Sequence, residues 1–502
     1  MKRAIRIFAF ALVLCFAVTA FAACNSGDDE SSDGSGAEAT KELFADLPDK
    51  DYGGATVTFL VEGDYRTTYA STEIMEQEGS PEVLNDNIKK RNELVESKFN
   101  VVIQEERTSD TQTMISTVRN AVLSNLTDYD IVMPYIPDAA TLALEDQFYL
   151  LNDLEYIDLN NPCWDQNAVN SLSINNKNYF ATGDISLLTL ACTHAIVFNK
   201  RMIETYGLET PYDLVNNNEW TIDKLQEMAR KVTADVDGET GMSYKDRYGF
   251  LINSNFVTSM YVGSGHSLTG KDDEDLPFVS IIEETETAVP IFNKIFELVN
   301  DSTATGLIDS TSGSYYSTAM SAGLNIWETA TQSVANDLAL FRAMAIIDII
   351  DLGNEDCDFG ILPVPKYSTS QENYHSLVST IYATSVAIPA SAADAEMSAI
   401  IAQAMCEAST ETTKDAYVEI ILKLRKIQDD ESEAMLDKIF AERVYDLGII
   451  YNWGGSGPAD ANSIGNFMNV VAFSGTQTFA STLESISSKV ESDLANTLST
   501  FE

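Results

Sequence analysis

The sequence has little positive charge and little histidine. Its 502 residues include 77 Asp+Glu but only 31 Lys+Arg, which gives a formal net charge of −46, and it holds three histidines. A surface this negative repels phosphate backbones, because nucleic-acid binding depends on lysine and arginine displacing counterions. The charge therefore excludes nucleic acid as a partner. It also disfavours anionic substrates unless a local basic pocket overrides the field.

Catalytic motifs are also missing. With His194, His266 and His375 as the only histidines, the chain has no HExxH zinc motif, and it contains no GxSxG nucleophile elbow. Residues 265–272, GHSLTGKD, approach a phosphate-binding loop, but Asp272 stands where that loop needs serine or threonine. We therefore predict a protein that is not an enzyme of these classes.

No metal site or cofactor motif is convincing. Residues 29–34 and 235–238 weakly resemble calcium-binding loops, but Thr40 and Tyr244 occupy the final position, where such a loop needs glutamate. No pair of cysteines or histidines has the spacing of a zinc site. The sequence predicts no metal and no cofactor.

Long hydrophobic runs are absent outside the N-terminus. Residues 1–23 have the form of a secretory signal: basic residues come first, an apolar run follows at 7–23, and small residues precede Cys24. No later stretch approaches the ~20 apolar residues that a membrane span needs. We expect the body of the protein to be exported and soluble.

Cys24 predicts a lipoprotein. Cleavage before this residue and acylation of its thiol would anchor the protein, although Phe21 stands where lipoprotein signals usually carry leucine. Serine, glycine and acidic residues dominate 25–41, a composition that cannot bury a core. We therefore predict an acylated Cys24 with a flexible acidic linker over 24–50, on the extracytoplasmic face of the cell membrane. The alternative is an ordinary signal peptide with an incidental cysteine.

The remaining cysteines do not form a framework. Cys15 lies in the signal, and the other four in the body are far apart in sequence. Buried free thiols are expected, and one disulfide is compatible with export. The pairing stays open for Cys163, Cys192, Cys357 and Cys406.

Strands and helices alternate at the start of the body. Residues 55–61, 100–104 and 129–133 are short β-branched or apolar runs, and apolar residues recur at helical spacing over 84–99 and 113–123. Alternation of this kind predicts a parallel sheet with helices on its faces. Ligands of such sheets bind beyond the carboxyl ends of the strands.

The middle of the chain continues the alternation. Strands are expected at 195–199, 248–253 and 381–389, and a helix at 221–232 that begins with Thr221 as its N-cap. The last hundred residues are predicted to be largely helical.

Several motifs, in their order along the chain, resemble a known family. They are YDIVMPYIP at 129–137, VFNK at 197–200, the helix after Trp220, and DFGILPVPK at 358–366. Together with Cys24 they are similar to extracellular solute-binding proteins of the carbohydrate type (family 1-like), in the long form of Gram-positive anaerobes. These are lipoprotein receptors of ABC importers. Cys163 departs from the pattern, because an aromatic residue is usual before Trp164-Asp165.

The resemblance implies an α/β, two-lobed periplasmic-binding-protein-like fold with a hinge, an interlobe cleft and a helical C-terminal region. Lobe 1 would combine residues 52–157 with 375–412, and lobe 2 would combine 158–374 with 413–502. The implied partners are a small-molecule ligand, a sugar by family, the permease subunits of an ABC transporter, and the membrane through the lipid anchor. A monomer is expected.

Aromatic and polar residues near strand ends are the candidate ligand contacts. By resemblance Trp327 follows a strand and stacks on the ligand, with Glu328 beside it as a hydroxyl acceptor; the alternatives are core packing and a solvated face. Trp453 in its glycine-rich turn either stacks on the ligand or packs, whereas Trp220 is expected to be structural. The remaining candidates are Tyr65, Arg66, Tyr135, Asp184, Asn253, Asn255 and Phe256.

Two classes of function remain. The first is a lipid-anchored receptor that captures a neutral sugar or oligosaccharide by lobe closure and delivers it to an ABC importer. The second is a lipid-anchored glycan-degrading hydrolase, because paired carboxylates are recognised by their spacing in space and not in sequence. The family motifs favour the receptor.

Overall fold

A computed structural model describes residues 43–502 apart from 64–68, 110, 354–356, 424–429 and 458–459. The predicted signal, Cys24, Tyr65 and Arg66 lie outside the described residues. Residues 43–502 cluster as one unit. None of the described helices has the length and apolar character needed to cross a membrane.

The first sheet confirms the predicted strand–helix alternation. Strands β1 (Ala55–Val61), β2 (Val101–Arg107) and β3 (Ile131–Met133) pair in parallel in the order β2-β1-β3. The helices between them are α1 (Glu82–Phe99) and α2 (Thr111–Ser124). The carboxyl ends of the three parallel strands therefore meet at one edge of the sheet.

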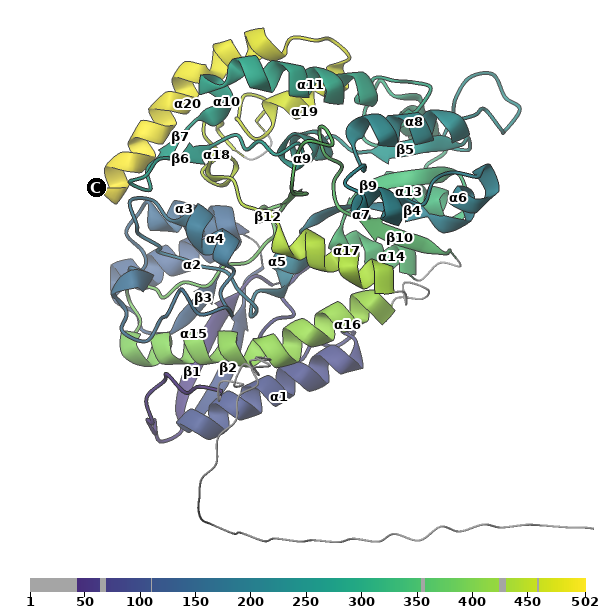
Figure 1. Ribbon diagram of the computed structural model, residues 1–502. Helices are drawn as coiled ribbons and strands as arrows, with labels where there is room; N and C mark the ends of the chain where they lie inside the picture. Colours follow the sequence, from purple (N-terminus) through teal and green to yellow (C-terminus); the bar gives the residue numbers. More distant parts are fainter. Residues whose placement is uncertain (1–42, 64–68, 110, 354–356, 424–429, 458–459) are drawn as a thin grey trace, which may run out of the picture. The chain divides into compact units, whose positions relative to one another are not determined.

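Chain segments from much later in the sequence extend this sheet. Val132 of β3 forms an antiparallel bridge with Ala387, and Val386 forms one with Ala181. The predicted strand at 381–389 is thus extended backbone beside β3. Helix α15 (Ala395–Ser409), the π-helical turn η3 (Thr410–Lys414) and α16 (Asp415–Lys423) then pack along α1 (Figure 1).

The second sheet has mixed pairing in the order β10-β4-β9-β5-β8. β5 is parallel to β8 and β9, whereas β4 is antiparallel to β9 and β10. The start of β4 therefore lies at the same edge as the ends of β5, β8 and β9. The bounds are β4 (His194–Asn199), β5 (Tyr248–Ile252), β8 (Thr305–Leu307), β9 (Ala339–Ala345) and β10 (Phe359–Leu362).

Helix α8 (Ile222–Val232) forms as predicted. The Thr221 side chain accepts a hydrogen bond from the Lys224 N–H at 3.3 Å, and the predicted apolar face is buried. Trp220, just before it, is fully buried, and its indole N–H donates to the Pro363 carbonyl at 2.9 Å. The structural role expected for Trp220 is confirmed.

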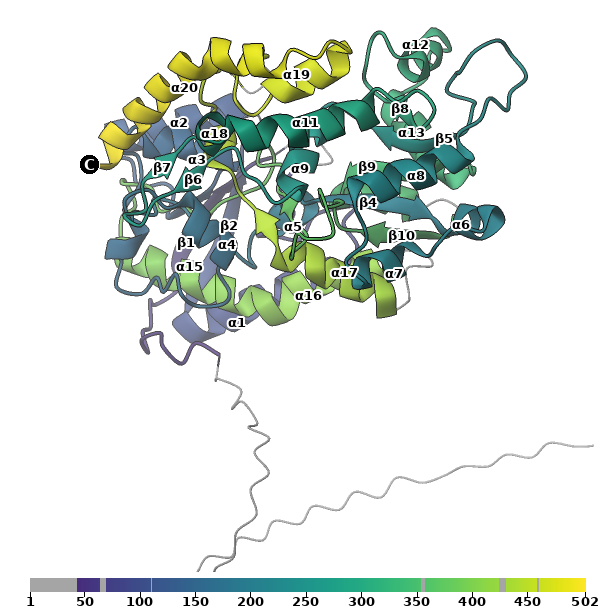
Figure 2. The same ribbon diagram turned by 45° about the horizontal axis from the view of Figure 1, so that its top comes forward.

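The C-terminal region is helical, as expected. Helices α19 (Phe467–Ser474) and α20 (Phe479–Phe501) pack on α11 (Thr285–Val299), and both views show them together (Figures 1 and 2). The other helices are α3 (Ile136–Ala143), α4 (Gln166–Leu172), α5 (Leu187–Ala191), α6 (Lys200–Tyr206), α7 (Pro211–Asn216), α9 (Phe256–Gly263), α10 (Ser280–Glu283), α12 (Ser314–Ser321), α13 (Ile326–Ala335), α14 (Ile346–Gly353), α17 (Asp430–Ala441) and α18 (Leu447–Ile450), with the 3₁₀ turn η2 (Leu151–Asp153). Two short pairs complete the fold: β6 (Gly270–Lys271) with β7 (Pro277–Phe278), and β11 (Ser376–Leu377) with β12 (Arg443–Val444).

The predicted linker is too long at its C-terminal end. Phe44 is buried and lies 5.9 Å from the Phe99 ring, centroid to centroid, and Leu47 packs against the same core. These apolar side chains join the core around the first sheet. The folded body therefore begins before residue 50, the predicted end of the linker.

The predicted boundary between the lobes at residues 157 and 158 also needs correction. Trp164 is buried in the core cluster that contains β1 and β2, and its indole N–H donates to Gln403 of α15 at 2.8 Å. Ala181 belongs to that cluster as well. Trp164 and Ala181 therefore pack with the first sheet, whereas Ile174 between them belongs to the core cluster that contains β4 and β5. Packing of η3 and α16 along α1 likewise places the start of the predicted 413–502 segment beside the first sheet.

Candidate ligand-binding site

Three tyrosine rings meet at the carboxyl edge of the first sheet. Tyr135 follows β3, Tyr69 comes from the loop after β1, and Tyr382 lies in the segment that returns to β3. The rings of Tyr69 and Tyr382 stack at 4.2 Å, and the Tyr135 ring meets Tyr382 edge-on at 5.6 Å. The Tyr135 hydroxyl donates to the Tyr69 carbonyl at 3.0 Å. Tyr135 is almost fully buried, whereas Tyr69 and Tyr382 are half-buried. These two rings offer aromatic surface at the carboxyl edge of the sheet, and ligands of open α/β sheets bind at such an edge.

A buried carboxylate fixes the loop that carries Tyr69. Glu73 is fully buried, and its Oε1 accepts the Leu188 N–H at 2.9 Å and the Thr384 hydroxyl at 2.7 Å. Its other oxygen accepts the Ser71 hydroxyl at 3.2 Å. Burial raises the pKa of Glu73 to about 7, although these donors favour its charged form. Glu73 thereby ties the loop to α5 and to the extended segment that bridges to β3 and Tyr135.

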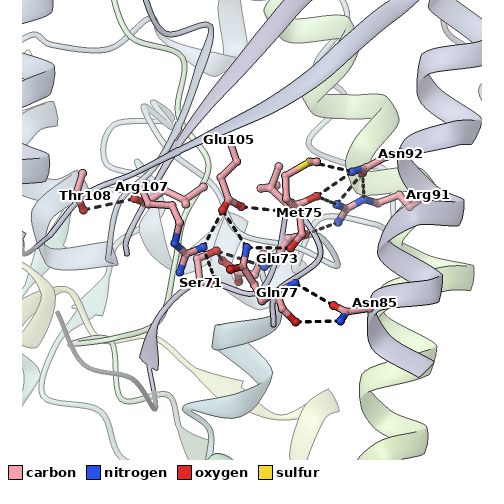
Figure 3. Close-up of polar contacts among 12 residues, drawn as sticks. Ser71, Glu73, Met75, Gln77, Asn85, Arg91, Asn92, Glu105, Arg107 and Thr108 are labelled. Carbon is pink, nitrogen blue, oxygen red and sulfur yellow. Dashed lines mark hydrogen bonds and ion pairs between the residues drawn. The ribbon is translucent and has the colours of Figure 1, made fainter. Parts of the chain in front are cut away.

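The guanidinium of Arg91 on α1 holds the backbone directly after the Glu73 side chain (Figure 3). Its two terminal nitrogens donate to the carbonyls of Glu73 at 2.7 Å and Ile74 at 2.9 Å. Burial lowers the pKa of Arg91 to about 9, and the charge of Glu73 opposes that shift. A buried arginine of this kind is stable because its donors are satisfied.

Glu105 of β2 anchors the rest of the loop, as Figure 3 shows. It accepts the Met75 N–H at 3.2 Å and the Gln77 amide at 3.1 Å. Arg107 forms an ion pair with Glu105 at 2.7 Å and donates to the Ser71 carbonyl at 2.9 Å. The loop after β1 is therefore bound to the sheet, to α1 and to α5 at once. Such support holds binding groups in place.

The second sheet presents another aromatic pair at its edge. His194 begins β4, Phe256 begins α9, and their rings stack at 4.1 Å with planes 20° apart. Both residues are buried. Asn253 and Asn255 follow the end of β5, and Asn253 is half-buried while Asn255 is exposed. The structure thus brings three of the predicted candidates together at one edge.

Asp184 forms an ion pair with Lys414. Its carboxylate lies 2.9 Å from the Lys414 ammonium and accepts the Thr410 hydroxyl at 2.8 Å. Burial raises the pKa of Asp184, and Lys414 opposes the shift. This geometry joins the segment after Trp164 to η3. These contacts give Asp184 a structural role that the sequence did not indicate.

The two remaining tryptophans differ in exposure. Trp327 is 46% exposed and lies in the first turn of α13, where the Asn325 side chain caps the helix by accepting its N–H at 2.9 Å. The expected strand before Trp327 is wrong, because this cap starts a helix there. Trp327 is not a core residue, and Glu328 beside it is exposed. Trp453 is 1% exposed, and its indole N–H donates to Thr497 at 2.9 Å, which argues against contact with a ligand.

Sequence reasoning missed four residues at these edges: Tyr69, Glu73, His194 and Tyr382. Tyr69 follows the predicted strand 55–61, so the rule that selected Tyr65 could have found it, whereas Tyr382 lies at the start of the predicted strand 381–389, where that rule does not apply. No sequence signal marks Glu73 or His194. Leu188 and Thr384, which bond Glu73, are more than 100 residues away in the sequence. The contact of His194 with Phe256 arises only when the chain packs.

An acidic group lies in the loop before β5. Carboxylate oxygens of Asp235, Asp237 and Asp246 lie within 4.8 Å of one another. Asp246 is buried and accepts backbone N–H groups of Val236 at 2.6 Å and Ser243 at 2.7 Å, and these bonds help to lower its pKa. The hydrogen bonds between Asp246 and the backbone of its own loop account for the position of the three aspartates.

The free cysteines are buried, as expected. Cys163, Cys192, Cys357 and Cys406 are thiols in the structure, and the Cys406 thiol donates to the Cys163 carbonyl at 3.0 Å.

Comparison with known proteins gives one family. The family model described as bacterial extracellular solute-binding protein matches residues 91–420. A search of the curated proteins found no match.

Solved structures share the fold at low sequence identity. A cyclo/maltodextrin-binding protein complexed with maltotetraose has a TM-score of 0.55 and 12% identity, over 88% of this chain and 97% of that chain. An ABC substrate-binding protein from Listeria monocytogenes, in complex with cycloalternan, has a TM-score of 0.53 and 10% identity, over 88% and 99%. A family 1 extracellular solute-binding protein from Bifidobacterium longum subsp. infantis has a TM-score of 0.53 and 15% identity, over 88% and 100%. The predicted two-lobed α/β fold class is confirmed.

Proposed function

Because the chain belongs to the bacterial extracellular solute-binding proteins, as its motifs predicted, we propose that it captures a neutral sugar or oligosaccharide and delivers it to an ABC importer. The observation that carries the proposal is the family match over residues 91–420, together with aromatic rings at the edge of each sheet where parallel strands end. Closure of the two lobes would bring these edges onto one ligand.

The site chemistry supports a sugar. Sugar rings stack their apolar faces on aromatic side chains, and the half-buried rings of Tyr69 and Tyr382 and the exposed ring of Trp327 offer such faces. Asn253, Asn255 and Glu328 are proposed to bond ligand hydroxyls, and Phe256 to shape the second edge. A net charge of −46 repels anions but has no such effect on a neutral ligand. Two of the similar structures are named as complexes with maltotetraose and cycloalternan, which supports the same ligand class.

Tyr65 and Arg66 stay proposed contacts. They lie outside the described residues, a few positions before Tyr69 in the sequence.

The lipid anchor and the permease complete the proposal. Cys24 is the proposed acylation site, and residues 25–41 would tether the body to the extracytoplasmic face of the membrane. The proposed partners are the permease subunits of an ABC transporter, and the receptor would act as a monomer.

A thermal-shift screen tests the ligand class. A ligand that binds only the folded state stabilises it by RT ln(1 + [L]/Kd), so neutral oligosaccharides should raise Tm. Peptides or phosphate esters that raise Tm while sugars do not would overturn the proposal. Chromatography of the recovered oligosaccharide separates the alternative function, because a glycan hydrolase would shorten it and a receptor would return it intact.

A further inference from the structure

The imidazole of His194 has an unused hydrogen-bonding atom at the edge of the second sheet. The residue is 6% exposed, and its Nδ1 is buried without a hydrogen-bond partner among the residues that the structure describes. Most buried polar atoms are paired, because an unpaired one loses its bonds to water without replacement. The Nδ1 of His194 therefore has the capacity for one further hydrogen bond.

The position of His194 is that of a binding group. As the first residue of β4 it pairs with Ala345, the last residue of β9, so it lies at the edge where β5 and β9 end. Its ring stacks on Phe256, which fixes the orientation of the imidazole plane. Ligands of open α/β sheets bind at this edge.

The chain around His194 also connects the two sheets. Thr193 forms an antiparallel bridge with Val378, and the Ser379 N–H donates to the Cys192 carbonyl at 2.9 Å. The two connecting segments thus run side by side next to the imidazole. A relative movement of the lobes would change the surroundings of this ring more than those of a residue deep in one core.

We propose that His194 is a specificity-determining residue of the sugar site, and that its Nδ1 forms a hydrogen bond with a ligand hydroxyl in the closed state. This inference rests on the proposed function and names a contact within it. A hydroxyl both donates and accepts, so it fits either neutral tautomer of the imidazole.

The charge state of the ring favours a neutral ligand. Burial lowers the pKa of His194 to about 3, so the imidazole is uncharged at neutral pH. An uncharged ring adds no charge attraction for a carboxylate or phosphate, which is consistent with a neutral ligand and with the net charge of the chain.

Histidine-selective NMR tests the contact directly. The chain has three histidines, so a protein labelled with ¹⁵N-histidine gives few signals to assign. Addition of an oligosaccharide found by thermal shift should move the Nδ1 resonance of His194. The resonances of His266, beyond the far end of α9, and of His375, which lies 3.6 Å from Glu442, should stay in place. A sugar that binds without moving the His194 resonance would overturn the inference.

Substitution gives an independent measurement. His194→Phe keeps an aromatic ring against Phe256 but removes the nitrogen, and sugar affinity should fall about threefold to tenfold, the usual effect of one neutral hydrogen bond. His266→Phe is the matched control and should bind as the wild type does. Unchanged affinity in a folded His194→Phe protein would refute the contact. If this variant does not fold, the NMR result on the wild type decides.

The outcomes separate the two proposals. Wild-type protein that binds no sugar contradicts the proposed function. Wild-type protein that binds sugar without a change in the His194 resonance contradicts this inference alone.

Discussion

Truncation of Trp327 is the sharpest test of the proposed site. The residue is 46% exposed, and its backbone is held by the Asn325 cap and not by its indole ring. A tryptophan has on the order of 250 Å² of surface, so roughly 100 Å² of this side chain is open to a ligand. At ~25 cal/mol per Å², complete coverage contributes about 2.5 kcal/mol.

Trp327→Ala should therefore weaken sugar binding by about 2 kcal/mol, which is roughly thirtyfold in Kd. Stability should change little, by within about 0.5 kcal/mol, because an exposed side chain loses few contacts. Calorimetric titration with the sugar and chemical denaturation of the same sample measure the two effects separately.

Trp453→Ala is the matched control. Its ring is buried and its indole N–H is bonded to Thr497, so this truncation should cost about 3–5 kcal/mol of unfolding free energy. If Trp327→Ala binds sugar as tightly as the wild type, the stacking argument is wrong. If Trp327→Ala instead loses as much stability as Trp453→Ala does, the indole ring of Trp327 packs in the core and does not stack on the ligand.

Three further predictions concern the anchor, the buried carboxylate and the ion pair. Cys24→Ala should abolish acylation and release the protein from the membrane fraction; lipid labelling that persists would refute the lipoprotein assignment. Burial raises the folded-state pKa of Glu73 from 4.5 to about 7, so its contribution to stability is full below pH 4.5 and is lost as the pH rises through 7. Glu73→Gln should flatten the pH dependence of unfolding free energy across that window, by on the order of 3 kcal/mol, whereas Glu93→Gln on the exposed face of α1 should not. Asp184→Ala should lower the unfolding free energy by about 1–3 kcal/mol, because it leaves Lys414 without its partner; lost affinity at unchanged stability would instead return Asp184 to the ligand site.

Local patterns predicted the early elements well. β1 runs over Ala55–Val61, as its β-branched sequence indicated, and α8 begins at its threonine cap. These features depend on neighbours a few residues apart, which the sequence displays directly. The start of α13 was missed because the side chain of Asn325 caps the helix, and the family resemblance favoured a strand there.

Sequence reasoning selected only some of the residues at the candidate site. Phe256 and Tyr135 were proposed because they follow strands, whereas His194 and Tyr382, whose rings they contact, were not. Asp184 was proposed as a ligand contact, and its ion pair with Lys414, 230 residues later in the chain, had no signal in the sequence. Exposure separated Trp327 from Trp453, and no local pattern distinguishes them.

By itself the sequence determined the class of this protein: its charge excluded nucleic acid, its order of motifs indicated the family, and its alternation of strands and helices implied parallel sheets. Only the tertiary structure decided which side chains share an edge. Glu73 shows the reason, because its carboxylate is defined by Leu188 and Thr384, groups 115 and 311 residues away. Burial and pairing of this kind arise from packing between distant segments, and they set the pKa, the exposure and the free hydrogen-bonding capacity on which binding depends.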